Sequence, residues 1–213
     1  MSAHPGVRAN PTGKELHFFD RFWDQPFGAH EASEYQRWFA RPPGCMSGEW
    51  TPSYMFDVWA PGLLKLAAPD ARLLVMLRDP LERYVSGLTH YLQRGAPHHP
   101  LVAGDAFRRG LYADQVLRLH EHLGPDQVLV LQYEACIRDP ARELARTYRF
   151  LGLEPSELAP ERLDRVVYGT RQHKEAVDPS MRMMLIDAYQ RDIRRLTDVL
   201  PELDLDLWPN FSP

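Results

Sequence analysis

A short apolar run that stops abruptly is the feature that most constrains this chain. Residues 73–77 read LLVML without polar alternation, which is typical of a strand covered on both faces in a parallel sheet. Asp79 and Pro80 follow at once as a helix N-cap and a first helical residue, and apolar residues then recur at helical spacing as far as Leu92. The stretch 71–95 is therefore predicted to fold as a strand, a tight turn and a helix.

The turn between this strand and this helix is a candidate anion site. The first turn of a helix presents backbone N–H groups and the positive end of the helix dipole, and this edge of a parallel sheet commonly binds ligands. Arg78 adds a guanidinium there, and Ser86, two turns into the helix, adds a hydroxyl. Both suit a phosphate, although an arbitrary Arg-Asp-Pro is more often part of a surface ion pair.

Composition limits the classes that remain. With 213 residues, 44% apolar and 25% charged, the chain can bury one sizeable core. The 25 basic and 29 acidic residues give a net charge of −4, which argues against a general nucleic-acid or membrane-surface binder. The start has no signal-peptide pattern and no apolar run is long enough to span a membrane, so a cytoplasmic location is expected. Cys45 and Cys136 lack metal spacing and are expected to be free thiols, with a disulfide as the less favoured alternative.

Two further segments concentrate chemically active residues. Residues 14–20 read KELHFFD and combine a lysine, two acids and a histidine with buried-type phenylalanines. Residues 48–54 read GEWTPSY, with a turn at Thr51-Pro52 followed by residues that suit a helix. By pattern alone, a segment like the first is more often a strand end with surface charges.

Together, the ordered segments KELHFFD, GEWTPSY and RDPLERYVS resemble the sulfotransferases that use 3′-phosphoadenosine 5′-phosphosulfate (PAPS). The resemblance is closest to the carbohydrate, heparan-sulfate-like branch and its bacterial relatives. It implies a P-loop-NTPase-like α/β fold, with a parallel sheet flanked by helices, in a single sulfotransferase domain over residues 1–213. It also implies PAPS as the sulfuryl donor, no metal, and a hydroxyl (less readily an amine) of a carbohydrate, lipid or small molecule as the acceptor.

The same resemblance assigns catalytic roles in the first segment. Glu15 is expected to be the general base, because a sugar hydroxyl attacks well only as its proton leaves. His17 is the rival base, since its ordinary pKa is nearer neutrality. His17 and Asp20 are expected to line the acceptor site, and Lys14 to lie close to the transferred group.

Nucleotide contacts are expected from other parts of the chain. The resemblance implies that Arg78 and Ser86 bind the 3′-phosphate of the nucleotide. The polar, basic segment 166–178 corresponds to a family loop that closes over the nucleotide, so Arg171 and Lys174 are further candidates, although such a cluster is usually a solvated face.

Trp50 marks a departure from the family pattern. Many carbohydrate sulfotransferases carry a lysine at this position, so one cation is lost and a less charged acceptor is favoured. Trp50 could instead stack on a sugar ring. Tyr112, in a Gly-x-Tyr segment, is a weaker candidate for a substrate or nucleotide contact.

The family's phosphate loop has no counterpart in this sequence. No Gly-rich loop precedes Lys14, and residues 1–7 resemble the last turn of a helix. The first strand and the phosphate loop are therefore expected to be missing, which makes the domain N-terminally incomplete. Because that strand is central in this fold, residues 1–213 alone are expected to be unstable or inactive.

The remaining elements follow from pattern. Strand 128–131 and helices 110–123, 140–151 and 179–200 are predicted, whereas 96–110 is predicted to be a loop, with an acceptor cover as its functional alternative. The adjacent His98 and His99 lack metal-ligand spacing. Aromatic residues between 21 and 48 are more typical of a satellite core than of a sugar site.

Two rival functions stay open. A nucleotide kinase of similar fold would need an intact phosphate loop and a Mg²⁺-directed Ser or Thr. A non-catalytic remnant would still bind adenosine 3′,5′-bisphosphate without turnover. The sequence indicates neither the acceptor nor the oligomeric state.

Overall fold

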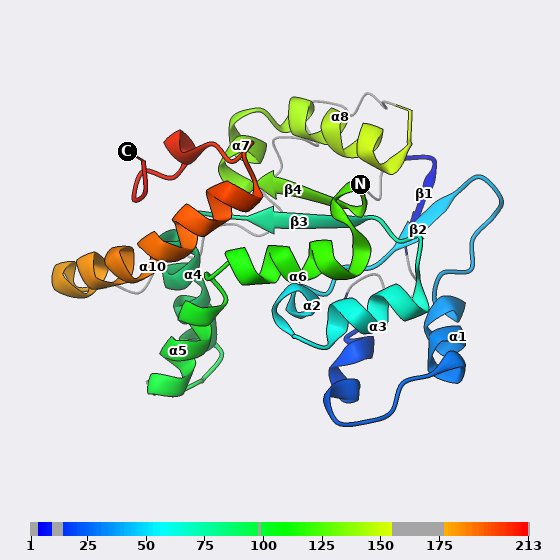
Figure 1. Cartoon of the computed structure of the whole chain (residues 1–213), viewed down its shortest axis with the longest axis horizontal. Coiled ribbons are helices and arrows are strands. Elements are labelled where there is room, and N and C mark those ends of the chain that lie inside the picture. The colour runs from blue at the N-terminus through cyan, green and yellow to red at the C-terminus, as the bar shows by residue number, and fades with distance from the viewer. Residues whose placement is uncertain (1–3, 10–14, 98, 155–176, 213) are drawn as a thin grey trace. The chain divides into compact units, whose positions relative to one another are not determined.

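The computed structural model describes residues 4–9, 15–97, 99–154 and 177–212 (Figure 1). The chain groups into two compact units. The first comprises Met1–Val75, Arg118–Leu129 and Leu144–Arg162, and the second comprises Met76–Leu117, Val130–Glu143 and Leu163–Pro213. No helix among the described residues is long and apolar enough to cross a membrane.

The central stretch folds as its pattern predicts. Strand β3 spans Leu73–Leu77 and helix α4 spans Pro80–Gln93. Asp79 caps the helix, because its Oδ1 accepts hydrogen bonds from the backbone N–H groups of Leu81 and Glu82 at 3.0 and 3.1 Å. Strand β4 (Val128–Gln132) neighbours β3 in a two-stranded sheet, and the two arrows run in the same direction in Figure 1. The α/β class and the strand–turn–helix unit are confirmed.

The two strands of this sheet differ in burial. All of β4 is buried, whereas Met76 in β3 is 53% exposed between the buried Val75 and Leu77. Side chains alternate between the two faces of a strand, so Met76 belongs to the opposite face. The expectation that β3 is covered on both faces is therefore wrong for the described residues.

A second, smaller sheet lies near the start of the chain. Strand β1 (Val7–Ala9) pairs in parallel with β2 (Met46–Gly48), with Val7 opposite Met46. The expected helical turn over residues 1–7 is wrong for the described part, since 4–6 form a turn and β1 begins at Val7. A strand of three residues is too short to show a period of two.

Most of the helices belong to one unit each. The first unit holds η1 (Phe18–Trp23), α1 (Ala29–Arg37), α2 (Ser53–Phe56), α3 (Ala60–Ala67) and η2 (Pro125–Gln127). The second holds α5 (Pro100–Arg108), α7 (Tyr133–Arg138), α10 (Pro179–Val199) and η3 (Leu205–Leu207). Helices α6 (Ala113–Leu123) and α8 (Pro140–Leu151) extend through both units.

Helix α5 corrects the predicted loop. Pro100 occupies its first turn, and the His99 side chain accepts a hydrogen bond from the Leu101 N–H at 3.2 Å. The helix is therefore capped at its start, where the sequence pattern predicts a loop. It packs against α4, so its stability comes from a contact that a local pattern does not reveal.

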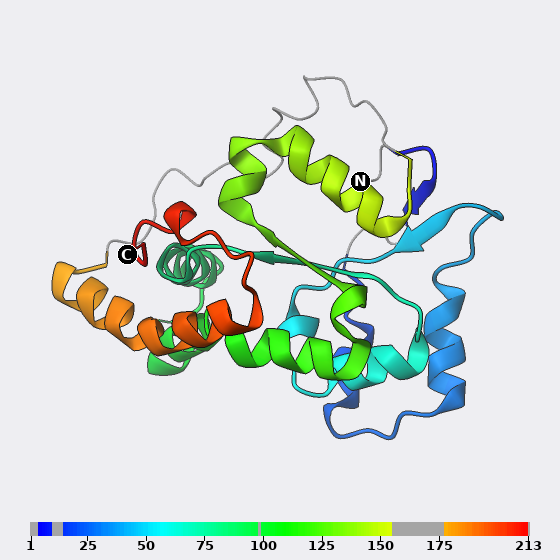
Figure 2. The same cartoon turned by 45° about the horizontal axis from the view of Figure 1, so that its top comes forward.

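The core of the second unit includes helices α10 and α4, which contact each other. Figure 2 shows α4 nearly end-on, with α10 running across the view. Leu185, Tyr189, Ile193 and Leu196 are buried, as the apolar stripe of α10 predicts, whereas Met181 is exposed. In the first unit, the rings of Phe19 and Tyr35 pack with centroids 4.7 Å apart.

The aromatic segment 21–48 is core only in part. Phe22 and Tyr35 are buried, in agreement with a satellite core, whereas Trp23 is 67% exposed.

Candidate active site

Glu15, His17 and Asp20 form a hydrogen-bonded cluster in the first unit. His17 Nε2 lies 3.0 Å from Glu15 Oε2, and His17 Nδ1 lies 2.8 Å from Asp20 Oδ2. His17 adopts φ 51° and ψ 29° directly before η1, a left-handed conformation that non-glycine residues rarely take. The structure thus brings together three of the four residues assigned to this segment, and Lys14 lies outside the described residues.

Both ring nitrogens of His17 face a carboxylate, and only the protonated imidazole has an N–H for each. Partial burial favours the neutral ring, but the hydrogen bonds and negative charges of Glu15 and Asp20 outweigh it and raise the pKa of His17 above 6.5. His17 is therefore more often protonated already than an ordinary histidine. This favours Glu15 over His17 as the group that accepts a proton from a substrate.

The GEWTPSY segment holds the Glu15–Asp20 segment in place. Thr51 Oγ1 accepts hydrogen bonds from the backbone N–H groups of Leu16 and His17 at 3.2 and 3.3 Å. The Thr51 hydroxyl in turn donates to Glu49 Oε2 at 2.5 Å, and the same oxygen accepts from the Leu16 N–H at 3.2 Å. The backbone that directly follows the candidate base is thus fixed by two side chains that are distant in sequence.

Two tyrosines, the buried Tyr35 and the partly buried Tyr54, complete this support. The Tyr54 hydroxyl accepts a hydrogen bond from the Phe18 N–H at 2.7 Å, and the Tyr35 hydroxyl donates to Glu49 Oε1 at 2.9 Å. Burial, and then the negative charge of Glu49, raise the pKa of both phenols. Glu49, Thr51 and Tyr54 received no role from the sequence, because their contacts appear only when the segments meet in space.

Trp50 differs from its neighbours in this segment. Its side chain is 61% exposed, whereas Thr51 is buried. The indole is therefore accessible for stacking on a ligand, as the sequence suggests for this position.

Arg78 lies at the carboxyl end of β3, in the second unit. The centre of its guanidinium is 5.0 Å from the centroid of the Tyr133 ring, and its Nη2 lies 3.6 Å from Glu82 Oε2. The side chain keeps 26% of its surface exposed. Ser86 is also exposed, and it follows Glu82 by four residues on the same side of α4.

The backbone at the start of α4 is already hydrogen-bonded within the protein. The Asp79 N–H donates to Glu134 Oε1 at 3.0 Å, Pro80 has no N–H, and the next two N–H groups bind Asp79 Oδ1. The expectation that these backbone groups bind an anion is therefore wrong, since an acid at the N-cap competes for the same donors. Any anion here must be bound by side chains.

Tyr112 supports Arg78 from behind. It is 4% exposed, and its hydroxyl donates to the Arg78 carbonyl oxygen at 3.0 Å. The Asp192 carboxylate accepts hydrogen bonds from the Tyr112 and Ala113 N–H groups at the start of α6, the shorter at 2.7 Å. These contacts argue against a direct substrate contact by Tyr112 and indicate a positioning role.

Arg171 and Lys174 lie outside the described residues. In the part of the chain that the structure describes, no group of three or more His, Cys, Asp or Glu side chains could hold a metal ion.

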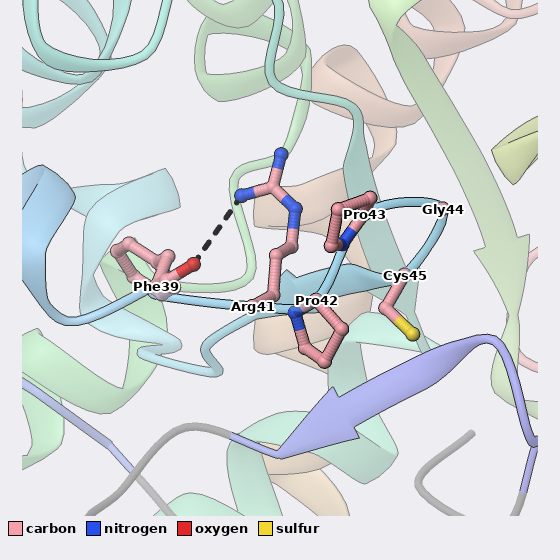
Figure 3. Close-up of a pocket in the computed structure, with 6 residues that line it drawn as sticks. All are labelled: Phe39, Arg41, Pro42, Pro43, Gly44 and Cys45. Atoms are coloured by element: carbon pink, nitrogen blue, oxygen red, sulfur yellow. Dashed lines mark hydrogen bonds between the residues drawn. The ribbon is translucent and has the colours of Figure 1, made fainter.

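A shallow hollow in the first unit is separate from the residues assigned above (Figure 3). The Arg41 side chain points toward Phe39, and its Nη1 donates to the Phe39 carbonyl oxygen at 3.4 Å. Its lining contains none of the assigned residues, so the candidate site is not placed there. The lining residues are Phe39, Arg41, Pro42, Pro43, Gly44 and Cys45.

The fold and these side chains define an α/β protein with a cation at the carboxyl end of a parallel strand and a carboxylate–histidine cluster. A model of the sulfotransferase family matches residues 9–157. The chain belongs to this family.

Known proteins resemble the chain in sequence and in structure. It is 32% identical over 170 residues to human heparan sulfate glucosamine 3-O-sulfotransferase 3B1, covering 72% of this chain and 42% of that protein. It is 33% identical over 168 residues to mouse heparan sulfate glucosamine 3-O-sulfotransferase 6, covering 72% and 47%. The chain thus spans less than half the length of these relatives.

Among solved structures, a sulfotransferase from Alicyclobacillus acidocaldarius is similar with a TM-score of 0.76 and 26% identity. The similarity covers 98% of this chain and 90% of that one. It confirms the sulfotransferase fold.

Proposed function

We propose that this protein transfers a sulfuryl group from PAPS to a hydroxyl group of a carbohydrate. Family membership and the 3-O-sulfotransferase relatives support the reaction class. The observation that carries the proposal is the Glu15–His17–Asp20 cluster. It holds a partly exposed carboxylate, and the Leu16 and His17 backbone that directly follows Glu15 is fixed by Thr51.

Glu15 is assigned as the general base. PAPS, when bound, would supply the sulfuryl group and leave as adenosine 3′,5′-bisphosphate. Glu15 accepts the acceptor's hydroxyl proton while that oxygen forms its bond to sulfur and the bond from sulfur to the bridging phosphate oxygen breaks. His17, held between Glu15 and Asp20, fixes the carboxylate by a hydrogen bond and stabilises its charge.

Arg78 and Ser86 are assigned to the 3′-phosphate of the nucleotide. The residues present fit such a group, because a partly exposed guanidinium oriented by Tyr133 and an exposed hydroxyl both bind phosphate oxygens. Lys14, Arg171 and Lys174 are proposed as the remaining cations around the transferred group and the nucleotide.

The proposed acceptor is a carbohydrate with little negative charge. Trp50 is exposed beside the residues that hold Glu15, and it stands where many carbohydrate sulfotransferases carry a lysine. An indole offers a stacking face to a sugar ring but no cation for a carboxylate or a sulfate.

A sulfate-transfer assay tests the proposal. The protein is incubated with PAPS and a panel of neutral and sulfated oligosaccharides, lipids and phenols, and sulfated products are detected by mass spectrometry. Glu15→Gln should lower kcat by about 10²–10⁴ while binding of adenosine 3′,5′-bisphosphate stays unchanged. The matched control is Glu121→Gln, which removes an exposed carboxylate of α6 in the same unit and should leave kcat unchanged.

Other outcomes identify the rival functions. Binding of the bisphosphate without any transfer would indicate a non-catalytic remnant. Phosphate transfer from ATP would indicate a kinase.

A further inference from the structure

Two guanidinium groups share one carboxylate at the start of α4. Glu82 Oε2 lies 3.6 Å from Arg78 Nη2, and Glu82 Oε1 lies 4.0 Å from Arg182 Nη1. Arg182 belongs to α10, beyond the residues that match the family model. In the described part of the chain, Glu82 thus brings a second guanidinium close to Arg78, the proposed phosphate-binding arginine.

Arg182 is held in this position by a second contact. Its Nη2 donates to Asn210 Oδ1 at 2.6 Å, and Asn210 Nδ2 donates to Asp79 Oδ2 at 2.8 Å. Asp79 is 1% exposed and is itself the N-cap of α4. A chain of hydrogen bonds therefore ties the Arg182 guanidinium to the same helix start that carries Arg78.

The contacts of Arg78 and Arg182 with Glu82 are long, so another anion could bind both arginines at shorter distance. Charge-assisted hydrogen bonds are about 2.7–2.9 Å long, and both contacts to Glu82 are longer than this. The Arg78 and Arg182 side chains keep 26% and 43% of their surface exposed. A phosphate has three terminal oxygens and can bind two guanidinium groups at short distance at once.

The backbone at the start of α4 cannot bind the phosphate, because its first N–H groups already donate to the Asp79 and Glu134 carboxylates. We propose that Arg182 is a second cation for the 3′-phosphate. Glu82 holds the two arginines together in the free protein and competes with the phosphate for them. This inference rests on the proposed function, specifically on the assignment of Arg78 to that phosphate.

Calorimetric titration with adenosine 3′,5′-bisphosphate and with adenosine 5′-phosphate, which lacks the 3′-phosphate, tests the inference. Arg182→Gln should weaken binding of the bisphosphate about tenfold and leave that of the monophosphate unchanged. Glu82→Gln should tighten binding of the bisphosphate, a change of sign that a purely structural role would not produce.

The matched controls are Arg191→Gln and Asp187→Asn, which make the same charge changes at exposed positions of α10. Neither should alter the preference for the bisphosphate.

The outcomes separate this inference from the proposed function. Arg78→Gln tests the proposed function itself, by its effect on the affinity for the bisphosphate. If Arg78→Gln lowers this affinity strongly, but Arg182→Gln lowers it no more than the control Arg191→Gln does, only the role of Arg182 is overturned. If Arg182→Gln weakens binding of a sulfated oligosaccharide but leaves binding of the bisphosphate unchanged, the inference is also overturned, because Arg182 then contacts the acceptor. No binding of the bisphosphate by the unmodified chain would overturn both.

Discussion

His17 shows how two neighbours decide the chemistry of a single residue. Its ring lies between Glu15 and Asp20, and its left-handed backbone places it there at some conformational cost. Such a conformation persists only where the surroundings enforce it. Here Thr51 binds the His17 N–H, and Tyr54 binds that of Phe18.

The raised pKa of His17 predicts a pH-dependent contribution to stability. Since the folded-state pKa lies above the unfolded value of 6.5, the contribution is fully present below about pH 6.5 and is lost as pH rises through the folded-state pKa. The free energy of unfolding of the unmodified protein minus that of His17→Gln should therefore be larger at about pH 5.5 than at about pH 8.5.

Urea unfolding across this pH range measures the difference. His30→Gln, at an exposed position of α1, is the matched control and should give a difference that does not vary in this way. A difference that grows with pH would contradict the assignment.

At the scale of elements, the packing of α10 against its neighbours organises the second unit. Tyr189 is fully buried, and its hydroxyl donates to the Phe107 carbonyl oxygen near the end of α5 at 3.0 Å. The Asp192 carboxylate, one turn further along α10, accepts hydrogen bonds from the Tyr112 and Ala113 N–H groups at the start of α6. One helix thus fixes the ends of two others, and through Tyr112 it supports the backbone of Arg78.

Gly110 makes this packing possible. A Cβ atom at Gly110 would lie 2.8 Å from the Tyr189 hydroxyl oxygen and 3.0 Å from two ring carbons. Gly110→Ala should lower the free energy of unfolding by about 1–3 kcal/mol, because a buried ring must move.

The matched control is Gly104→Ala in α5, where a Cβ atom would meet nothing within 4 Å. It should raise the free energy of unfolding by about 0.5–1 kcal/mol, since glycine is unfavourable inside a helix. Urea unfolding of both variants measures the two changes in the free energy of unfolding, which should have opposite signs. Equal changes would refute the steric argument.

At the scale of the whole molecule, the two compact units share continuous secondary structure. The chain passes from one unit to the other within β3, α6, β4 and α8, at Val75, Leu117, Leu129 and Glu143. Unfolding one unit alone would therefore have to break two strands and two helices in their interiors. Regular elements are cooperative, so this is unfavourable.

This continuity predicts one cooperative unfolding transition. Tryptophan fluorescence, near-ultraviolet and far-ultraviolet circular dichroism should give coincident curves. Tyr54→Phe in the first unit and Gly110→Ala in the second should each shift all three curves together. Separate midpoints would indicate two independently stable units, and would also contradict the expectation of a single domain over residues 1–213.

Sequence alone determined the features whose signals are local. The bounds of β3, the Asp79 cap and the start of α4 follow from an apolar run, an N-capping acid and a proline within eight residues. The family resemblance likewise singled out Glu15, His17 and Asp20, because they lie within one short segment.

Only the tertiary structure decided what depends on residues far apart in the chain. Thr51 binding the backbone of His17 and Arg182 meeting Glu82 join positions more than 30 residues apart. Helix α5 also depends on tertiary packing, in its case against the preceding helix α4. Such contacts arise from the three-dimensional path of the backbone, so they leave no periodic pattern or local signal in the sequence that could have predicted them.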